Sequence, residues 1–353
     1  AGGATLTFAD GTTQTVSDNL VLKGADSNLL SLAGTGSIVA SGTSSFEGEY
    51  LSVGSGVTIQ ENGSAIVAGA FSVSQSVPNP DSDIAVVINN GWKFPALSFE
   101  WTGTSDSSWS NPANWNPAIV PGITNFEDSV VSVPVVTSGN YPELDDSPYT
   151  VSKLTVGSES ATEASLTIGE SKSLSVTSSL LNYGTILLSD TASLTASGTF
   201  SNFGTVDYSG SSRITDGANS INDTAHGGTV VYSGGTSGSP QTVTKFSSSG
   251  ADYANLVITG TAQCENSISV GGNLLVDGGT LTASDALSVS GNLTFESGAS
   301  GTLSGANSFG GKVIIGTQTV AAGDISLSGE NTFTGGVSVI LGGNIRSEEH
   351  TSE

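Results

Sequence analysis

Self-similar segments recur along this chain at spacings of 19 to 24 residues. The clearest pair is LSGANSFGGKVII, which starts at Leu303, and LSGENTFTGGVSV, which starts 24 positions later at Leu327. A repeat of this length fits one coil of a β-helix, which needs two or three short strands and their turns. The matched ladder positions are Asn182 with Asn202, Asn307 with Asn331, and Phe309 with Phe333.

Apolar residues in these repeats alternate with polar ones, as in SLTIG at 165–169 and NLLVD at 273–277. Such alternation predicts strands with one buried face. No stretch of ten or more residues places apolar side chains at helical spacing. The sequence therefore predicts an all-β parallel β-helix, or β-solenoid. Asparagine and glycine are expected at its turns, because both tolerate positive φ. A propeller would require about 40 residues per blade.

A change in composition divides the chain. Residues 1–97 have coil-like sequence that ends in NNGWKF, whereas 98–150 are rich in tryptophan and proline, and repetition resumes in 151–345. Proline cannot donate a ladder hydrogen bond. We therefore expect 98–150 to interrupt the solenoid as a junction or small β-rich cap, braced by Trp101, Trp109 and Trp115.

The last eight residues, 346–353 (RSEEHTSE), break the pattern abruptly. They resemble the translation of a sequencing adapter, so we leave them out of the fold prediction and expect the natural protein to continue past Ile345. The chain also has no methionine, leader or apolar run long enough to cross a membrane. These features predict a mature chain or an internal fragment, with no direct membrane insertion in this segment.

Charge narrows the set of partners. Thirty-two acidic residues face eight basic ones, which gives a net charge of −24. Nucleic acid and anionic lipid would be repelled, so neither is an expected partner. The single cysteine, Cys264, excludes an internal disulfide. Stability must therefore come from packing and hydrogen-bond ladders.

Several motifs resemble those of large bacterial surface proteins with autotransporter-associated β-strand repeats, which are adhesin-like and similar to filamentous haemagglutinin. LSGENTFTGGVSV resembles the repeat of autotransporter passenger chains. WTGTSDSSWSNPANW, starting at Trp101, with the later VPG resembles a segment that opens repeat modules, and NNGWKF resembles the end of the preceding module. The resemblance implies a right-handed β-helix that is exported, and an adhesive or structural role.

The sequence gives only weak signals for catalytic or metal-binding residues. A polysaccharide lyase of β-helical fold needs a clustered base, but the eight Lys and Arg residues are scattered singly. A glycosidase needs two facing carboxylates, and the neighbouring Asp145 and Asp146 would point to opposite faces of a strand. His226 and Cys264 lack partners for a metal site, and Asp81-Ser82-Asp83 lacks the remainder of a calcium loop. We expect no catalytic residue, metal or cofactor.

Three functions remain as hypotheses. The first is an extracellular structural or adhesive protein at the bacterial cell surface, within a filament or fibrous layer. Its partner would be further coils or copies of itself, end to end, with glycans or a host surface as additional partners. The second is a carbohydrate-binding module that stacks sugars on Trp101, Trp109 and Trp115; the competing interpretation of these rings is junction packing. The third is a polysaccharide-degrading enzyme. Two or more exposed coplanar rings would favour the second hypothesis.

Overall fold

The computed structural model forms two compact units, unit 1 from residues 1–99 and 115–130 and unit 2 from residues 100–114 and 131–353. Within them the structure describes residues 3–25, 28–40, 45–61, 64–66, 71–74, 76–78, 87, 90–94, 97–122, 128–137, 139–146, 148–210, 213–216, 227–245, 251–296, 298–316, 322–339 and 345–348.

Unit 1 is a parallel β-solenoid with three sheets, ordered β1–β4–β7–β10, β2–β5–β8 and β3–β6–β9–β11. Three consecutive strands make one coil, and the next three stack on them in register. Its buried column contains Leu32, Ile38, Val53, Ile59 and Trp92. The strands of these sheets are β1 (Thr5–Phe8), β2 (Thr13–Val16), β3 (Leu20–Lys23), β4 (Leu30–Gly34), β5 (Ser37–Ala40), β6 (Phe46–Glu49), β7 (Leu51–Val53), β8 (Thr58–Glu61), β9 (Phe71–Ser74), β10 (Val77–Pro78) and β11 (Trp92–Lys93). The short strand β13 (Trp115–Asn116) lies outside these three sheets.

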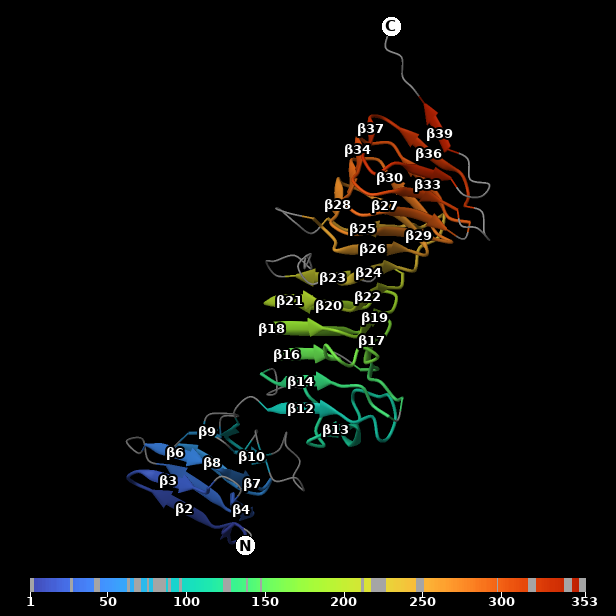
Figure 1. Ribbon diagram of the computed structural model, residues 1–353. Helices are drawn as coiled ribbons and strands as arrows, with labels where there is room; N and C mark the ends of the chain where they lie inside the picture. Colours follow the sequence, from blue (N-terminus) through green and yellow to red (C-terminus); the bar gives the residue numbers. More distant parts are fainter. Residues whose placement is uncertain are drawn as a thin grey trace. The chain divides into compact units, whose positions relative to one another are not determined.

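Unit 2 is built on a ten-stranded parallel sheet ordered β15–β17–β19–β22–β24–β26–β29–β32–β35–β38. Figure 1 labels β17, β19, β22, β24, β26 and β29 of this sheet, which are stacked as successive rungs. They are β15 (Glu143–Leu144), β17 (Ser165–Ile168), β19 (Thr185–Leu188), β22 (Thr205–Tyr208), β24 (Thr229–Tyr232), β26 (Asn255–Ile258), β29 (Leu274–Asp277), β32 (Leu293–Glu296), β35 (Val313–Ile315) and β38 (Val337–Val339).

The cross-section of unit 2 changes along the chain. Its earlier coils close against one further sheet, which contains β12 (Ser98–Trp101), β14 (Val130–Val133), β16 (Tyr149–Val156), β18 (Ser173–Asn182), β20 (Ser193–Ala196), β21 (Thr199–Asn202) and β23 (Arg213–Asp216). The long strand β18 pairs with two strands of the next coil. Its first half pairs with β20 and its second half pairs with β21.

The later coils of unit 2 have three sheets, since two new sheets replace the one that ends at β23. One contains β25 (Gln241–Val243), β27 (Thr261–Cys264), β30 (Thr280–Ala283), β33 (Ser300–Leu303), β36 (Ile325–Ser328) and β39 (Ile345–Glu348). The other contains β28 (Ile268–Val270), β31 (Leu287–Val289), β34 (Asn307–Phe309) and β37 (Asn331–Phe333).

Alternation of side chains explains why these segments form strands. In β19, Ile186 and Leu188 are buried, and Thr185 and Leu187, which alternate with them, face outward. Their register partners Val206 and Tyr208 in β22 repeat the arrangement one coil later. Each such aliphatic side chain contributes about 1.5–3 kcal/mol when it leaves water. The core is therefore a column of stacked, in-register apolar residues.

The predicted all-β parallel β-solenoid is confirmed. In the described part of the chain, helical structure is limited to the 3-10 helix η1 (Pro112–Asn114) and to Val87. The repeat spacing also set the register correctly, because Asn182 pairs with Asn202 and Phe309 with Phe333.

The Trp/Pro-rich segment does not stop the stacking of strands, because β12, β14 and β16 are consecutive neighbours in one sheet. The long connection from β12 to β14 leaves the coil and carries η1. At the other end, Arg346–Glu348, which belong to the segment that resembles an adapter translation, are part of β39 and pair with β36. Backbone pairing on an open sheet edge needs no particular side chain, so an atypical sequence can extend it.

Candidate functional site

The tryptophans proposed as a sugar platform are buried. The exposed fraction is 0% for Trp101 and Trp109 and 3% for Trp115. The Trp101 Nε1–H donates to the carbonyl of Asn140 at 2.8 Å, and the Trp109 ring lies 5.9 Å from the ring of Tyr149, centroid to centroid. A sugar can stack only on an open ring face, so this geometry favours the packing interpretation over the platform.

The carboxylate of Asp106 and the side-chain amide of Asn114 hold the loop at 102–114. Asp106 accepts hydrogen bonds from the Asn114 Nδ2 at 2.6 Å, from the Ser108 N–H at 2.9 Å and from the Asn111 Nδ2 at 2.8 Å. These bonds, with the one from Asn114 the largest, lower the pKa of Asp106. A carboxylate surrounded by donors in this way stays ionised and braces the loop, which is a poor arrangement for a general acid.

Asp145 is tied to the same loop. Its side chain accepts hydrogen bonds from the Ser108 hydroxyl, and from the Ser110 N–H at 3.4 Å and hydroxyl at 3.3 Å. Partial burial raises the pKa of Asp145, but hydrogen bonds from Ser108 and Ser110 outweigh it, so the net shift is downward. Asp145 and Asp146 are both exposed at the surface. The carboxylate of Asp145 therefore has a bracing role like that of Asp106.

Other candidate groups give no reactive centre in the described chain. Burial raises the pKa of the Cys264 thiol to about 12, so this side chain stays protonated. Among the described residues, no three His, Cys, Asp or Glu side chains gather where they could hold a metal ion. His226 and Asp81–Asp83 lie outside the described residues.

Asn182 and Asn202 form an internal amide ladder. Both are buried, and the Asn182 Nδ2 donates to the Asn202 Oδ1 at 2.8 Å and to the Thr205 carbonyl at 3.0 Å. Of the turn and ladder roles expected for these asparagines, they have the ladder role, because they lie at the ends of β18 and β21 and pair in register. The hydrogen bond between the two amides offsets part of the cost of burying them, although the Asn182 Oδ1 accepts no hydrogen bond.

Asn307 and Asn331 form a second ladder, in which the Asn307 Nδ2 donates to the Asn331 Oδ1 at 2.7 Å. A third, exposed ladder was not recognised from the sequence, although its signal was the GNL element that recurs after 19 residues. In it the backbone N–H of Asn273 donates to the Asn255 Oδ1 at 3.0 Å, and that of Asn292 to the Asn273 Oδ1 at 2.9 Å. These side chains fix the register of successive coils.

Aromatic residues stack at the same spacing. The rings of Phe309 and Phe333 lie 5.3 Å apart at 28°, and those of Tyr183 and Phe203 lie 4.6 Å apart at 16°. Phe309 is buried in the core, whereas Phe333, Tyr183 and Phe203 are half-buried. The proposed phenylalanine ladder is therefore a packing feature that runs along the coil axis.

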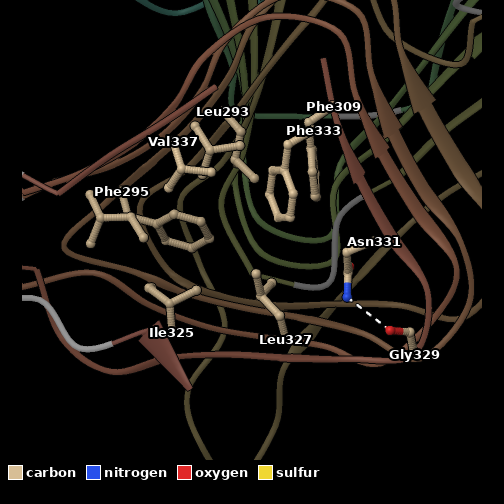
Figure 2. Close-up of a pocket in the computed structure, with 11 residues that line it drawn as sticks. Leu293, Phe295, Phe309, Ile325, Leu327, Gly329, Asn331, Phe333 and Val337 are labelled. Carbon is tan, nitrogen blue, oxygen red and sulfur yellow. Dashed lines mark hydrogen bonds between the residues drawn. The ribbon is translucent and has the colours of Figure 1, made fainter. Parts of the chain in front are cut away.

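Two cavities open at the ends of the coil stacks. Unit 2 has a cavity of about 480 Å³ at its last coil, lined by Phe295, Phe309, Leu327, Phe333 and Val337 among others. Figure 2 shows these apolar side chains gathered around it, with Asn331 hydrogen-bonded to Gly329 at one side. Unit 1 has a cavity of about 460 Å³ at its first coil, lined by residues that include Leu6, Phe8, Val16, Leu20 and Leu22. Each is the open end of an apolar column.

Asp207 occupies an outward position of the ten-stranded sheet, between two aliphatic residues of the neighbouring strands. Its register neighbours are Leu187 on one side and Val231 on the other. Burial among them raises the pKa of Asp207, and the hydrogen bond from Ser233 only partly offsets this. The ionised carboxylate is thus less well solvated in the folded state than in the unfolded chain.

Replacing Asp207 by Asn should therefore stabilise unit 2 near neutral pH. A carboxyl group whose pKa is raised in the folded state binds more protons when folded than when unfolded. Its contribution to the free energy of unfolding is therefore largest at acid pH and is lost as the pH rises through the folded-state pKa. The variant's advantage in thermal unfolding should be present at about pH 7 and should vanish below about pH 4. The exposed Asp285→Asn is the control, and an equal gain there at neutral pH would contradict the explanation.

Comparison with known proteins gives one partial match. Residues 100–245 are similar to the model of a family described as a domain of unknown function, DUF8693. The match begins at Glu100, where unit 2 also begins. No curated protein and no solved structure matches the chain significantly. Within the described residues, no helix has the length and hydropathy needed to span a membrane.

Proposed function

We propose that this protein is an extracellular structural or adhesive component of a fibrous bacterial surface layer, and that it is not an enzyme. The observation that carries the proposal is the regular, in-register stacking of ten strands in unit 2, held by internal amide and aromatic ladders. Such a scaffold repeats one surface over a long distance, which suits display or fibre formation.

The distribution of polar groups supports the same role. The carboxylates of Asp106 and Asp145 accept hydrogen bonds from asparagine and serine side chains, and these bonds brace a loop. The net charge of −24 keeps such surfaces apart in solution and limits non-specific lateral association. The burial of Trp101, Trp109 and Trp115 removes the feature on which the carbohydrate-binding alternative depended.

Location is the property that tests this proposal. Antibodies against the purified chain should label the outside of intact cells that produce the protein, as seen by immunogold electron microscopy. External protease should remove the label without lysing the cells, and an antibody against an internal protein serves as the control for lysis. Label confined to the cell interior would overturn the proposal.

A further inference from the structure

The outward face of β26, β29 and β32 repeats one set of side chains in three successive coils. Each rung presents an asparagine at or just before the start of the strand, an aliphatic or methyl-bearing residue at its centre, and an acid or a hydroxyl at its far end. These sets are Asn255, Val257 and Thr259 on the β26 rung, Asn273, Leu275 and Asp277 on the β29 rung, and Asn292, Thr294 and Glu296 on the β32 rung. In the same sheet β24 and β35 flank the three strands, so this face lies between other coils of the structure.

The side chains of the three asparagines are fixed by the coil that follows. Each Oδ1 accepts a hydrogen bond from a backbone N–H one coil later, and the donors are Asn273 at 3.0 Å, Asn292 at 2.9 Å and Lys312 at 2.9 Å. A glycine precedes each donor, and a Cβ there would lie 2.5–2.8 Å from the asparagine oxygen. The Asn273 and Asn292 side chains are exposed, and within the described chain their Nδ2 groups donate to no residue. One edge of the face is therefore a fixed row of amide donors.

The opposite edge of the face carries two neighbouring carboxylates. Asp277 and Glu296 are register partners on β29 and β32, and both side chains are half-buried. Among the residues that the structure describes, neither is paired with a lysine or an arginine. Like charges directly opposite each other on adjacent strands repel, so this arrangement costs the fold stability. An ionised carboxylate only accepts hydrogen bonds, and this edge is therefore a row of acceptors.

The ligand that fits this face is a linear polymer with one unit per coil. Successive rungs lie about 4.8 Å apart, which is close to the length of one sugar unit in an extended glycan chain. A sugar ring has a C–H face that packs on aliphatic side chains such as Val257 and Leu275. Its hydroxyls both accept and donate hydrogen bonds, so they suit a donor row on one edge and an acceptor row on the other.

Other linear polymers fit the face less well. The net charge of −24 repels nucleic acid and acidic glycans. A peptide strand that extends a sheet needs an unpaired edge, whereas β29 is already paired with β26 on one side and β32 on the other. A neutral glycan needs no free backbone group and is not repelled.

We propose that the outward face of β26, β29 and β32 binds a neutral, unbranched hexose chain that runs along the coil axis. The sugar rings pack on Val257, Leu275 and the methyl group of Thr294. The asparagine amides donate to the hydroxyls on one edge of the chain, and Asp277 and Glu296 accept from those on the other. This inference rests on the adhesive role proposed above and names the class of its ligand. It does not involve the buried tryptophans.

The dependence of binding on glycan length is the first test. The purified chain is applied to an array of linear gluco-, manno- and galacto-oligosaccharides, from disaccharides to hexasaccharides, with oligogalacturonates as the acidic counterparts. Calorimetry with the series that binds should show an affinity that rises up to about three or four units, because the three rungs hold about one unit each, and then levels off. Acidic oligosaccharides should not bind. The proposal is overturned if no neutral series binds, or if a disaccharide binds as tightly as a hexasaccharide.

A double substitution, Asp277→Ala with Glu296→Ala, tests the acceptor row. It should weaken glycan binding at least about tenfold, because hydrogen bonds to both carboxylates are lost. Neither residue belongs to the core or to the amide ladder, so the circular dichroism spectrum and the unfolding midpoint should be retained. The matched control, Glu265→Ala with Asp285→Ala, removes the same charge from exposed positions outside this face and should bind like the unmodified chain. Full binding by the first variant, or an equal loss in the control, would contradict the proposal.

The outcomes separate this inference from the proposed function. Surface labelling of a protein that binds no neutral glycan would leave the structural role standing and reject the glycan site. Glycan binding with the expected length dependence, by a protein found inside cells, would have the reverse meaning.

Discussion

Gly260→Ala should destabilise unit 2 by about 3 kcal/mol, a large effect for the addition of one methyl group. Gly260 lies between β26 and β27, and its N–H donates to the carbonyl of Tyr232 in the preceding coil. A Cβ at this position would overlap the carbonyl oxygen of Gly234. Both atoms belong to backbones in neighbouring coils, so no rotamer change can relieve the clash, and the coils must separate locally.

Gly238→Ala is the matched control, because it lies in the same unit and a Cβ there would have no atom within 4 Å. Its stability should stay within about 0.5 kcal/mol of the unmodified protein. Urea unfolding followed by circular dichroism measures both variants. Equal stability of the two would show that the coils are not packed as closely as the structure indicates.

Trp101→Ala should cost unit 2 about 3–5 kcal/mol. The ring is fully buried, so its removal leaves a large cavity at the start of the sheet, and the Asn140 carbonyl loses its donor. Trp101→Phe separates these terms, since it keeps most of the apolar volume and removes the N–H. We expect it to cost about 1–2 kcal/mol, mainly from the loss of the hydrogen bond that the indole N–H donates.

The control for Trp101 is Glu100→Gln on the same strand, where the side chain is exposed and a change of less than about 0.5 kcal/mol is expected. Urea unfolding and hydrogen exchange in β12, β14 and β16 give the readout. A small loss for Trp101→Ala would indicate that the ring does not brace the unit, and would reopen its interpretation as a surface platform.

Much of the fold was predictable because each coil of a β-solenoid repeats the same alternation of buried and outward-facing residues. Spacings of 20 and 24 residues placed Asn182 beside Asn202 and Phe309 beside Phe333, as the register confirms. The coil length was less predictable. Leu256 pairs with Leu274, only 18 positions on, and Thr229 pairs with Asn255, 26 positions on, because turns gain or lose residues without disturbing the strands.

The roles of single residues were harder to predict. The same sequence pattern is compatible with a tryptophan packed in the core and with one that binds a sugar at the surface. For Trp101 and Trp109, only their burial distinguished these two roles. An asparagine near glycine suits a turn or an internal ladder, and Asn182 proved to be a ladder residue since its partner Asn202 lies 2.8 Å away in the next coil. Contacts of this kind depend on residues brought together by stacking.

The sequence by itself determined the all-β class, the parallel stacking and the identity of the core columns, because alternation and repeat length are properties of the chain. Only the tertiary structure decided which faces of the coils are closed. Val313 and Val337 belong to the same kind of strand and the same column, yet one is buried and the other is 46% exposed. The difference depends on whether another coil lies above the residue, and this is a property of packing rather than of local sequence.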